Sequence, residues 1–91
     1  MGLFSSYKRN ISRIEFSEAC SVLYSTGFSE TNVNDVHKVF RGDLDESLDS
    51  EKGIDAGEIE RGIKWLGENK SKHSLSSGQI ETLESVLRKK L

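Results

Sequence analysis

The sequence predicts an all-α fold of four short helices, and three observations lead to that prediction. One capping pattern recurs along the 91-residue chain: a large apolar residue, Ser or Asp, two further residues, Glu or Gln, and another large apolar residue. The chain contains no proline, and its glycines fall mostly near the ends of proposed helices or in connections. No stretch combines sustained apolar–polar alternation with many β-branched residues, so we expect no strands.

The capping pattern marks three helix starts. The copies occupy residues 11–16, 54–59 and 75–80, with Ser12, Asp55 and Ser76 as the capping residues. In each copy the Ser or Asp oxygen accepts a hydrogen bond from a backbone N–H group, and the Glu or Gln side chain bonds back to the cap. The flanking apolar pair fixes the direction of the chain. A looser fourth copy, at residues 28–33, has Asn32 where Glu is expected.

The first two helices are expected to form an antiparallel pair. The first runs over about residues 13–26, where Gly27 ends it, and the second ends near residues 41–42. Only residues 28–29 separate them, so the second helix folds back beside the first. Their inward stripes are Phe16, Ala19, Cys20 and Leu23 in the first helix, and Val33, Val36 and Phe40 in the second.

The last two helices are expected to form a second pair, joined to the first through an acidic connection. The third starts at the Asp55 cap and ends near residues 68–69, and the fourth starts after Ser76. Basic residues 88–90 oppose the negative end of the dipole of the fourth helix, which explains them without a ligand. The inward stripes are Ile59, Ile63 and Leu66, then Ile80, Leu83 and Leu87.

Composition limits both the size of the fold and the classes of function. A chain of this length has room for one modest core, and a net charge of −2 gives no basic field that would favour direct nucleic-acid binding. The single cysteine, Cys20, excludes an intramolecular disulfide, and no apolar run approaches the roughly 20 residues needed to cross a bilayer. We expect one helical domain over residues 1–91, frayed over residues 1–11, in the cytoplasm, with its oligomeric state left open.

The N-terminus satisfies the short pattern for N-myristoylation at Gly2, with Lys8 and Arg9 just behind it. The alternative is an ordinary N-terminal segment. We expect no membrane contact unless Gly2 is lipidated.

A faint internal repeat relates the first and third helices at an offset of 43 residues. Ile11 aligns with Ile54, Glu15 with Glu58, Phe16 with Ile59, Cys20 with Ile63 and Leu23 with Leu66. Either the unit was duplicated, or two copies of one helix cap arose separately.

Catalysis is not expected from this sequence. Cys20 lies on the apolar face of the first helix, as a small core residue would. His37 is expected at the edge of the second helix and His73 in a solvated connection, with no Asp or Cys nearby at ligand or triad spacing. No glycine-rich phosphate loop and no Cys/His zinc set occurs.

The acidic stretch from Asp43 to Glu60 is the segment with the most chemical potential. It holds over half of the acidic side chains, with Lys52 as its only basic residue. Most of it forms a connection that is long for so small a domain.

Residues 47–58 resemble the twelve-residue calcium loop of an EF-hand, and the offset of 43 residues is similar to the spacing of paired EF-hands. The resemblance extends over residues 29–69. It implies oxygen ligands from Asp49, Glu51, the Gly53 carbonyl, Asp55 and Glu58. Ile54 takes the apolar eighth place, which in the family makes the short pairing between two loops. Ser47 stands in the first place, where the family has Asp, and Lys52 in the sixth, where it has Gly.

The acidic and aromatic residues lead to two hypotheses for function. The first is a small non-enzymatic, EF-hand-like protein-interaction module, with calcium as the candidate ion but a metal-free form favoured. Trp65, one helical step away from the inward stripe, is its candidate anchor for a protein partner or else completes the core. The alternative is a metal-independent acidic regulator or inhibitor that binds a basic site on another protein through Asp43, Asp45, Glu46 and the residues up to Glu51.

Overall fold

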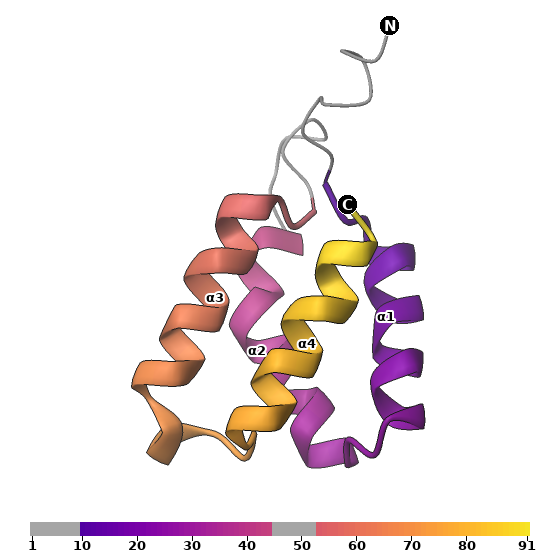
Figure 1. The fold of residues 1–91 in the computed structure, drawn as a ribbon. Coiled ribbons are helices and arrows are strands. Elements are labelled where there is room, and N and C mark those ends of the chain that lie inside the picture. Colours follow the sequence, from indigo (N-terminus) through magenta and orange to yellow (C-terminus); the bar gives the residue numbers. More distant parts are fainter. Residues whose placement is uncertain (1–9, 45–52) are drawn as a thin grey trace, which may run out of the picture.

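Four helices form a ring in which each helix packs against two neighbours (Figure 1). The computed structural model of the chain describes residues 10–44 and 53–91, and only the backbone of residues 42–44. The helices are α1 (Arg13–Ser25), α2 (Glu30–Leu44), α3 (Ala56–Glu68) and α4 (Ser77–Lys89), with the short 3-10 helix η3 (Lys70–Lys72) before α4. Consecutive α-helices run in opposite directions, and α4 closes the ring against α1. The prediction of an all-α fold of four helices is confirmed.

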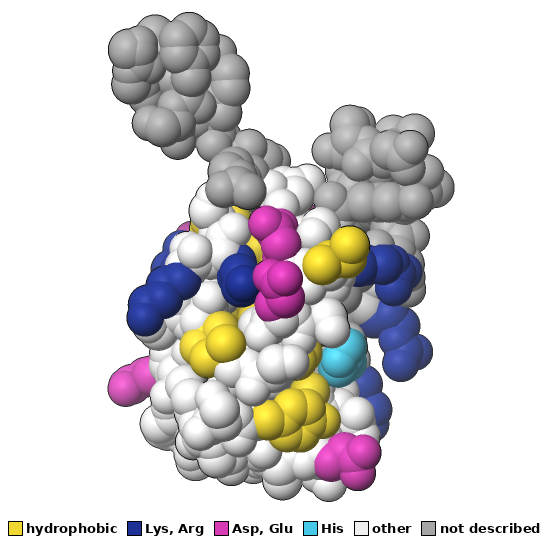
Figure 2. Space-filling view, turned by 90° about the vertical axis from the view of Figure 1, so that its right-hand side faces the viewer, with side chains coloured by type: hydrophobic (Ala, Val, Ile, Leu, Met, Phe, Trp, Pro, Cys, Tyr) yellow, Lys and Arg dark blue, Asp and Glu magenta, His cyan; other side chains and the backbone are white. Residues whose placement is uncertain are grey.

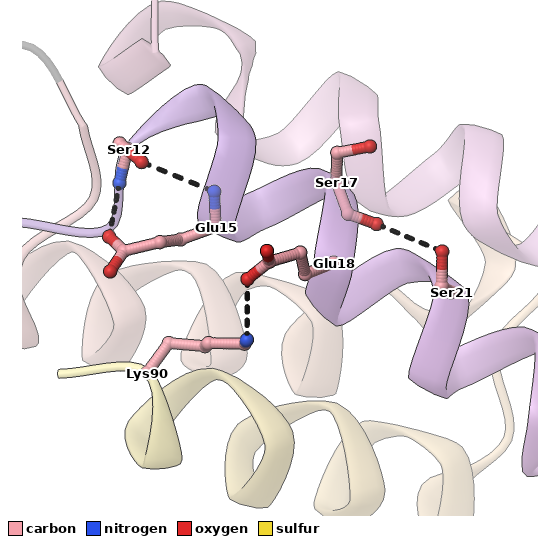
Figure 3. A network of polar contacts seen from close by, with 6 residues as sticks. All are labelled: Ser12, Glu15, Ser17, Glu18, Ser21 and Lys90. Atoms are coloured by element: carbon pink, nitrogen blue, oxygen red, sulfur yellow. Dashed lines mark hydrogen bonds and ion pairs between the residues drawn. The ribbon is translucent and has the colours of Figure 1, made fainter.

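Each predicted helix start is a reciprocal cap. Ser12 Oγ accepts a hydrogen bond of 3.2 Å from the Glu15 N–H group, and Glu15 Oε1 accepts one of 3.0 Å from the Ser12 N–H group (Figure 3). The same exchange joins Asp55 to Glu58 at the start of α3 and Ser76 to Gln79 at the start of α4. These bonds satisfy backbone N–H groups that the first turn of a helix leaves without partners.

The fourth, looser copy of the pattern also forms a reciprocal cap. Ser29 Oγ accepts from the Asn32 N–H group at 3.1 Å, and Asn32 Oδ1 accepts from the Ser29 N–H group at 2.8 Å. Asn32 thus does at α2 what Glu or Gln does at the other three helices.

The core follows the predicted stripes with one correction and four additions. Ile63, predicted to be buried, is half-buried and packs against the edge of the core. The other predicted core residues are buried, from Phe16 at α1 to Leu87 at α4. The additions are the apolar residues that precede the caps, namely Ile11, Phe28, Ile54 and Leu75. Each closes one end of the core as the first member of its hydrophobic staple.

Ile11 and Ile54 form an isolated antiparallel bridge at the end of the bundle where α1 and α3 begin. The Ile11 N–H group donates to the Ile54 carbonyl at 2.8 Å, and the Ile54 N–H group donates to the Ile11 carbonyl at 3.0 Å. Ile11 is fully buried, so its placement in a frayed N-terminal segment is wrong. Residues 1–9 of that segment lie outside the described residues.

The two helical pairs match each other in the positions of their helices and caps. Residues of α3 correspond to those of α1 at the offset of 43, and the Ile11–Ile54 bridge joins two equivalent positions. The α4 cap, Ser76 and Gln79, likewise corresponds to the α2 cap, Ser29 and Asn32, at an offset of 47 residues. We call these two pairs the halves of the bundle.

Two boundaries differ from the prediction. The backbone of α2 continues through Leu44, beyond the expected end near residues 41–42, and η3 lies in a connection where no helix was expected. In residues 10–44 and 53–91, no helix combines the length and the apolar character that crossing a membrane requires.

Candidate functional site

A groove with a volume of about 420 Å³ is lined by residues of α2 and α3 and of the connection between η3 and α4. The α2 side is formed by Asp35, Lys38 and Val39, which recur at three- and four-residue steps along one face of the helix. We call this hollow the α2–α3 groove.

The α3 side of the groove is formed by Glu58, Arg61, Gly62 and Trp65, which also follow helical spacing. Gly62 is buried, and a Cβ atom at this position would lie 2.6 Å from Cζ of Phe40. The absence of a side chain at Gly62 therefore lets α3 approach α2 closely.

Trp65, one helical step from the inward stripe, borders the groove with 41% of its surface exposed. Its ring centroid lies 6.1 Å from that of His73, which reaches the groove from the connection after η3. The two rings form an aromatic wall, next to which the Lys72 side chain also lines the groove.

His73 is not solvated as expected but half-buried and held through both ring nitrogens. The Leu75 N–H group donates to Nδ1 at 3.0 Å, so Nδ1 accepts. Nε2 lies 2.8 Å from the Leu66 carbonyl, which can only accept, so Nε2 carries the proton. Two backbone groups thus fix the orientation of the ring beside Trp65.

Asp35 ties α2 to the chain that precedes α4. Its Oδ2 atom accepts hydrogen bonds from the Ser74 N–H group at 2.9 Å and from Ser74 Oγ at 2.7 Å. The hydroxyl bond from Ser74 lowers the pKa of this carboxyl, helped by the Ser74 backbone bond and by attraction to Lys38. The Asp35 carboxylate is therefore already engaged by the fold.

Of the metal ligands that the sequence implied, Gly53, Asp55 and Glu58 lie in the described residues. Gly53 has a φ of +109° beside the Ile11–Ile54 bridge, and Asp55 and Glu58 exchange the α3 cap at 2.8 and 2.9 Å. Asp49 and Glu51 lie outside the described residues. Within residues 10–44 and 53–91, no three His, Cys, Asp or Glu side chains are grouped as a metal site requires.

The acidic residues of the alternative hypothesis lie outside the residues that form the groove. Asp45 and Glu46 lie outside the described residues, and Asp43 is described only as backbone in the last turn of α2.

The structure brings Cys20 and His37 together, which their separation of 17 residues did not predict. Cys20 Sγ lies 3.7 Å from His37 Nε2, and the His37 ring meets the edge of Phe16 at a centroid distance of 5.0 Å. Cys20 is only 5% exposed, and burial raises the pKa of its thiol to about 11. Because the thiolate is the nucleophile, burial works against a catalytic use of this pair.

The opposite side of the bundle, over α1, presents a different surface (Figure 2). Hydrophobic side chains there are separated by polar ones, and acidic side chains lie next to a basic one. Lys90 Nζ forms an ion pair with Glu18 Oε1 at 2.9 Å, and this contact joins the end of α4 to α1 (Figure 3).

The sequence singles out Trp65 as a candidate but does not predict the residues that surround it. The face of α2 that carries Asp35 and Lys38 looks like an ordinary solvated face, and nothing in the sequence joins it to His73. Gly62, within an otherwise regular helix, was the available signal, since an internal helical glycine often marks close packing.

No protein-family model, curated protein or solved structure matches this chain.

Proposed function

We propose that this protein is a small non-enzymatic interaction module of EF-hand-like helix–loop–helix design that holds a protein partner in the α2–α3 groove. The observation that carries the proposal is Trp65, which is left 41% exposed beside a hollow of about 420 Å³. Tryptophan is enriched among the residues that dominate binding energy at protein interfaces, above all next to a pocket.

The two halves of the bundle differ where the groove lies. At the offset of 43 residues, Gly62 corresponds to the buried Ala19 and Trp65 to Val22. A buried alanine and an exposed valine suffice for the α1–α4 contact, so bundle packing alone does not call for a glycine and a tryptophan. These differences fit a function that only the α2–α3 side performs.

The EF-hand-like part of the proposal draws on the other end of the bundle. The Ile11–Ile54 bridge joins the segments that precede two capped helices, and Ile54 occupies the place that pairs loops in that family. The α3 cap supports the same design, because the family begins its exiting helix with such a cap.

We propose that partner binding does not depend on metal. Glu58 belongs both to the implied calcium ligands and to the lining of the groove, so a calcium effect on binding would be visible at this residue. Its Oε1 atom already accepts the Asp55 N–H group at 2.9 Å, and the remaining groove side chains are not among the implied ligands.

Selection of peptides from a random display library on the immobilised full chain tests the proposal. Selected peptides are expected to shift the emission of Trp65, the only tryptophan of the chain, and to bind equally in calcium and in a chelator. Trp65→Ala is expected to weaken their binding by at least roughly tenfold, the loss of one interface anchor.

Val22→Ala is the matched control, since Val22 is the exposed counterpart of Trp65 in the other half. It should leave peptide affinity unchanged. Peptides that bind Trp65→Ala as well as the natural chain would place the binding surface elsewhere and overturn the proposal. Binding that requires calcium, with amide shifts at residues 53–58 that Glu58→Gln abolishes, would overturn its metal-independent part.

A further inference from the structure

The groove is bordered by three cationic side chains that the fold does not use. Among residues 10–44 and 53–91, the side chains of Lys38, Arg61 and Lys72 form no hydrogen bond or ion pair. Lys38 acts on the Asp35 carboxyl only by longer-range attraction. The chain as a whole has a net charge of −2, whereas the side chains around the groove include three cations and two carboxylates, so the local charge is positive.

The two carboxylates of the groove accept hydrogen bonds from neighbouring groups of the fold, whereas the three cations donate none among the described residues. Asp35 accepts both Ser74 groups, and Glu58 accepts the Asp55 N–H group through Oε1. The fold thus partly satisfies the two carboxylates, whereas the three cations have no hydrogen-bonding partner among the described residues and outnumber them, so the groove favours an anionic occupant.

The middle of the groove is apolar and aromatic. Val39 and the bare backbone of Gly62 lie between the two helices, and Trp65 and His73 form the wall. Both nitrogens of His73 are bonded to backbone groups. The ring can therefore contact an occupant of the groove through its flat face but cannot form a hydrogen bond with it. An apolar centre inside a charged, exposed rim is the usual anatomy of a protein interface.

We propose that the occupant is an acidic peptide segment of the partner. Its bulky apolar side chain lies over Gly62 against Trp65, and its flanking carboxylates pair with Lys38, Arg61 and Lys72. This inference rests on the proposed function, because it names the chemistry of the partner that the groove holds.

A peptide fits the observations better than a small metabolite. Small-molecule sites fix their ligands with a few convergent buried polar groups. In the described residues, no buried side-chain polar atom lacks a partner, and the free cations stand on exposed, flexible stems. Such a rim suits carboxylates spread along a chain rather than one compact anion.

Titration of the isotope-labelled full chain with three short synthetic peptides tests the inference. The first has a central Phe between Asp and Glu residues, the second replaces that Phe by Ala, and the third replaces the acidic residues by Lys. The first peptide is expected to shift the amides of Val39, Gly62 and Trp65 and to bind more weakly as salt rises. The second and third are expected to bind at least roughly tenfold more weakly.

Arg61→Glu and Lys64→Glu form a matched pair of variants. Both reverse one exposed charge on α3, but only Arg61 lines the groove. Arg61→Glu is expected to raise the dissociation constant of the acidic peptide by roughly three- to tenfold. Lys64→Glu is expected to change it less than twofold.

The outcomes separate this inference from the proposed function. If the lysine peptide, or a neutral one, shifts the groove amides and the acidic peptide does not, the acidic occupant is wrong and the interaction module stands. If inorganic phosphate or free glutamate produces the same shifts at the same concentration as the acidic peptide, the peptide occupant is overturned in favour of a small anion. If no peptide, including those from the display library, perturbs the groove, both proposals fail.

Discussion

Asn32 and Gln79 meet at the end of the bundle where α2 and α4 begin, and Gln79 Nε2 donates a hydrogen bond of 3.1 Å to Asn32 Oδ1. Each is the third residue of its helix and each bonds back to its own cap. The starts of α2 and α4 are thus joined by side chains, as the starts of α1 and α3 are joined at the opposite end by the Ile11–Ile54 backbone bridge. Each end of the bundle is closed by one pair of equivalent residues.

The Asn32 contacts explain why the fourth cap departs from the pattern. Asn32 is only 8% exposed, and its Nδ2 atom donates to Ser74 Oγ at 2.7 Å, which a Glu side chain cannot do. We expect Asn32→Glu to destabilise the protein by about 2–4 kcal/mol, since it removes a donor and buries a carboxylate. Denaturant unfolding measures this loss, with Ser29→Ala, expected to cost about 1 kcal/mol, as the control for the cap alone. Equal or greater stability of Asn32→Glu would contradict the explanation.

Two glycines of similar backbone geometry differ in their surroundings, and this difference predicts unequal costs. Gly53 has a φ of +109° and Gly27 a φ of +105°, but an added Cβ would lie 2.6 Å from the Ile11 carbonyl oxygen only at Gly53. Gly27→Ala is expected to cost about 1–2 kcal/mol from backbone strain. Gly53→Ala is expected to cost roughly 3–4 kcal/mol, because the bridge must also open. Similar unfolding midpoints for the two variants would show that the bridge contributes little.

Gly62 and Gly67 form a second matched pair, both within α3. An added Cβ at Gly62 would meet the Phe40 ring, whereas at Gly67 it would meet nothing within 4 Å. Gly62→Ala is expected to destabilise by about 1–3 kcal/mol through overpacking, and Gly67→Ala to stabilise by up to about 1 kcal/mol through helix propensity. Combining Gly62→Ala with Phe40→Leu should cost less than the sum of the single changes. Strict additivity in thermal or denaturant unfolding would argue against this contact.

Asp35 predicts a dependence of stability on acid pH. The bonds from Ser74 lower the pKa of the folded carboxyl, so in acid the unfolded chain binds more protons than the folded one. The stabilisation is therefore complete above the usual Asp value of about 4 and is lost as the pH falls below it. Wild type is expected to exceed Asp35→Asn slightly in stability near neutral pH and to lose this advantage as the pH falls through the lowered pKa of the folded carboxyl, the difference being small because the group is largely exposed. A stability advantage of wild type over Asp35→Asn that grows as the pH falls would contradict this prediction.

Cys20 is expected to be unreactive while the protein is folded. Burial raises the pKa of its thiol from 9.0 to about 11, so near neutral pH the thiolate is about one hundredfold scarcer than in an exposed thiol. Labelling with a thiol-specific disulfide reagent should therefore be at least about one hundredfold slower in the native protein than in denaturant. The chain has a single cysteine, so the signal is unambiguous. Comparable rates in the two states would mean that Cys20 is accessible.

The helix caps and the buried faces of the helices can be predicted from the sequence. Each of the four helices begins after a Ser or Asp cap, which exchanges hydrogen bonds with the residue three positions later. These bonds form within one turn of the helix. The stripes at three- and four-residue steps give the buried faces for the same reason, because they depend only on the geometry of one helix. The place of Trp65 one helical step from such a stripe is equally local, but whether it is exposed or completes the core stayed open in the sequence.

The relations between distant residues were decided by the tertiary structure alone. Helix periodicity says which face of α2 turns inward, but not that its outer edge meets Trp65 and His73 in a groove. That meeting depends on how closely α2 and α3 approach, which Gly62 and Phe40 set through a contact between helices. The burial of Ile11 likewise depends on its pairing with Ile54, 43 residues away. Caps and stripes are short-range and can be predicted, whereas bridges and grooves arise only when surfaces from separate helices pack together.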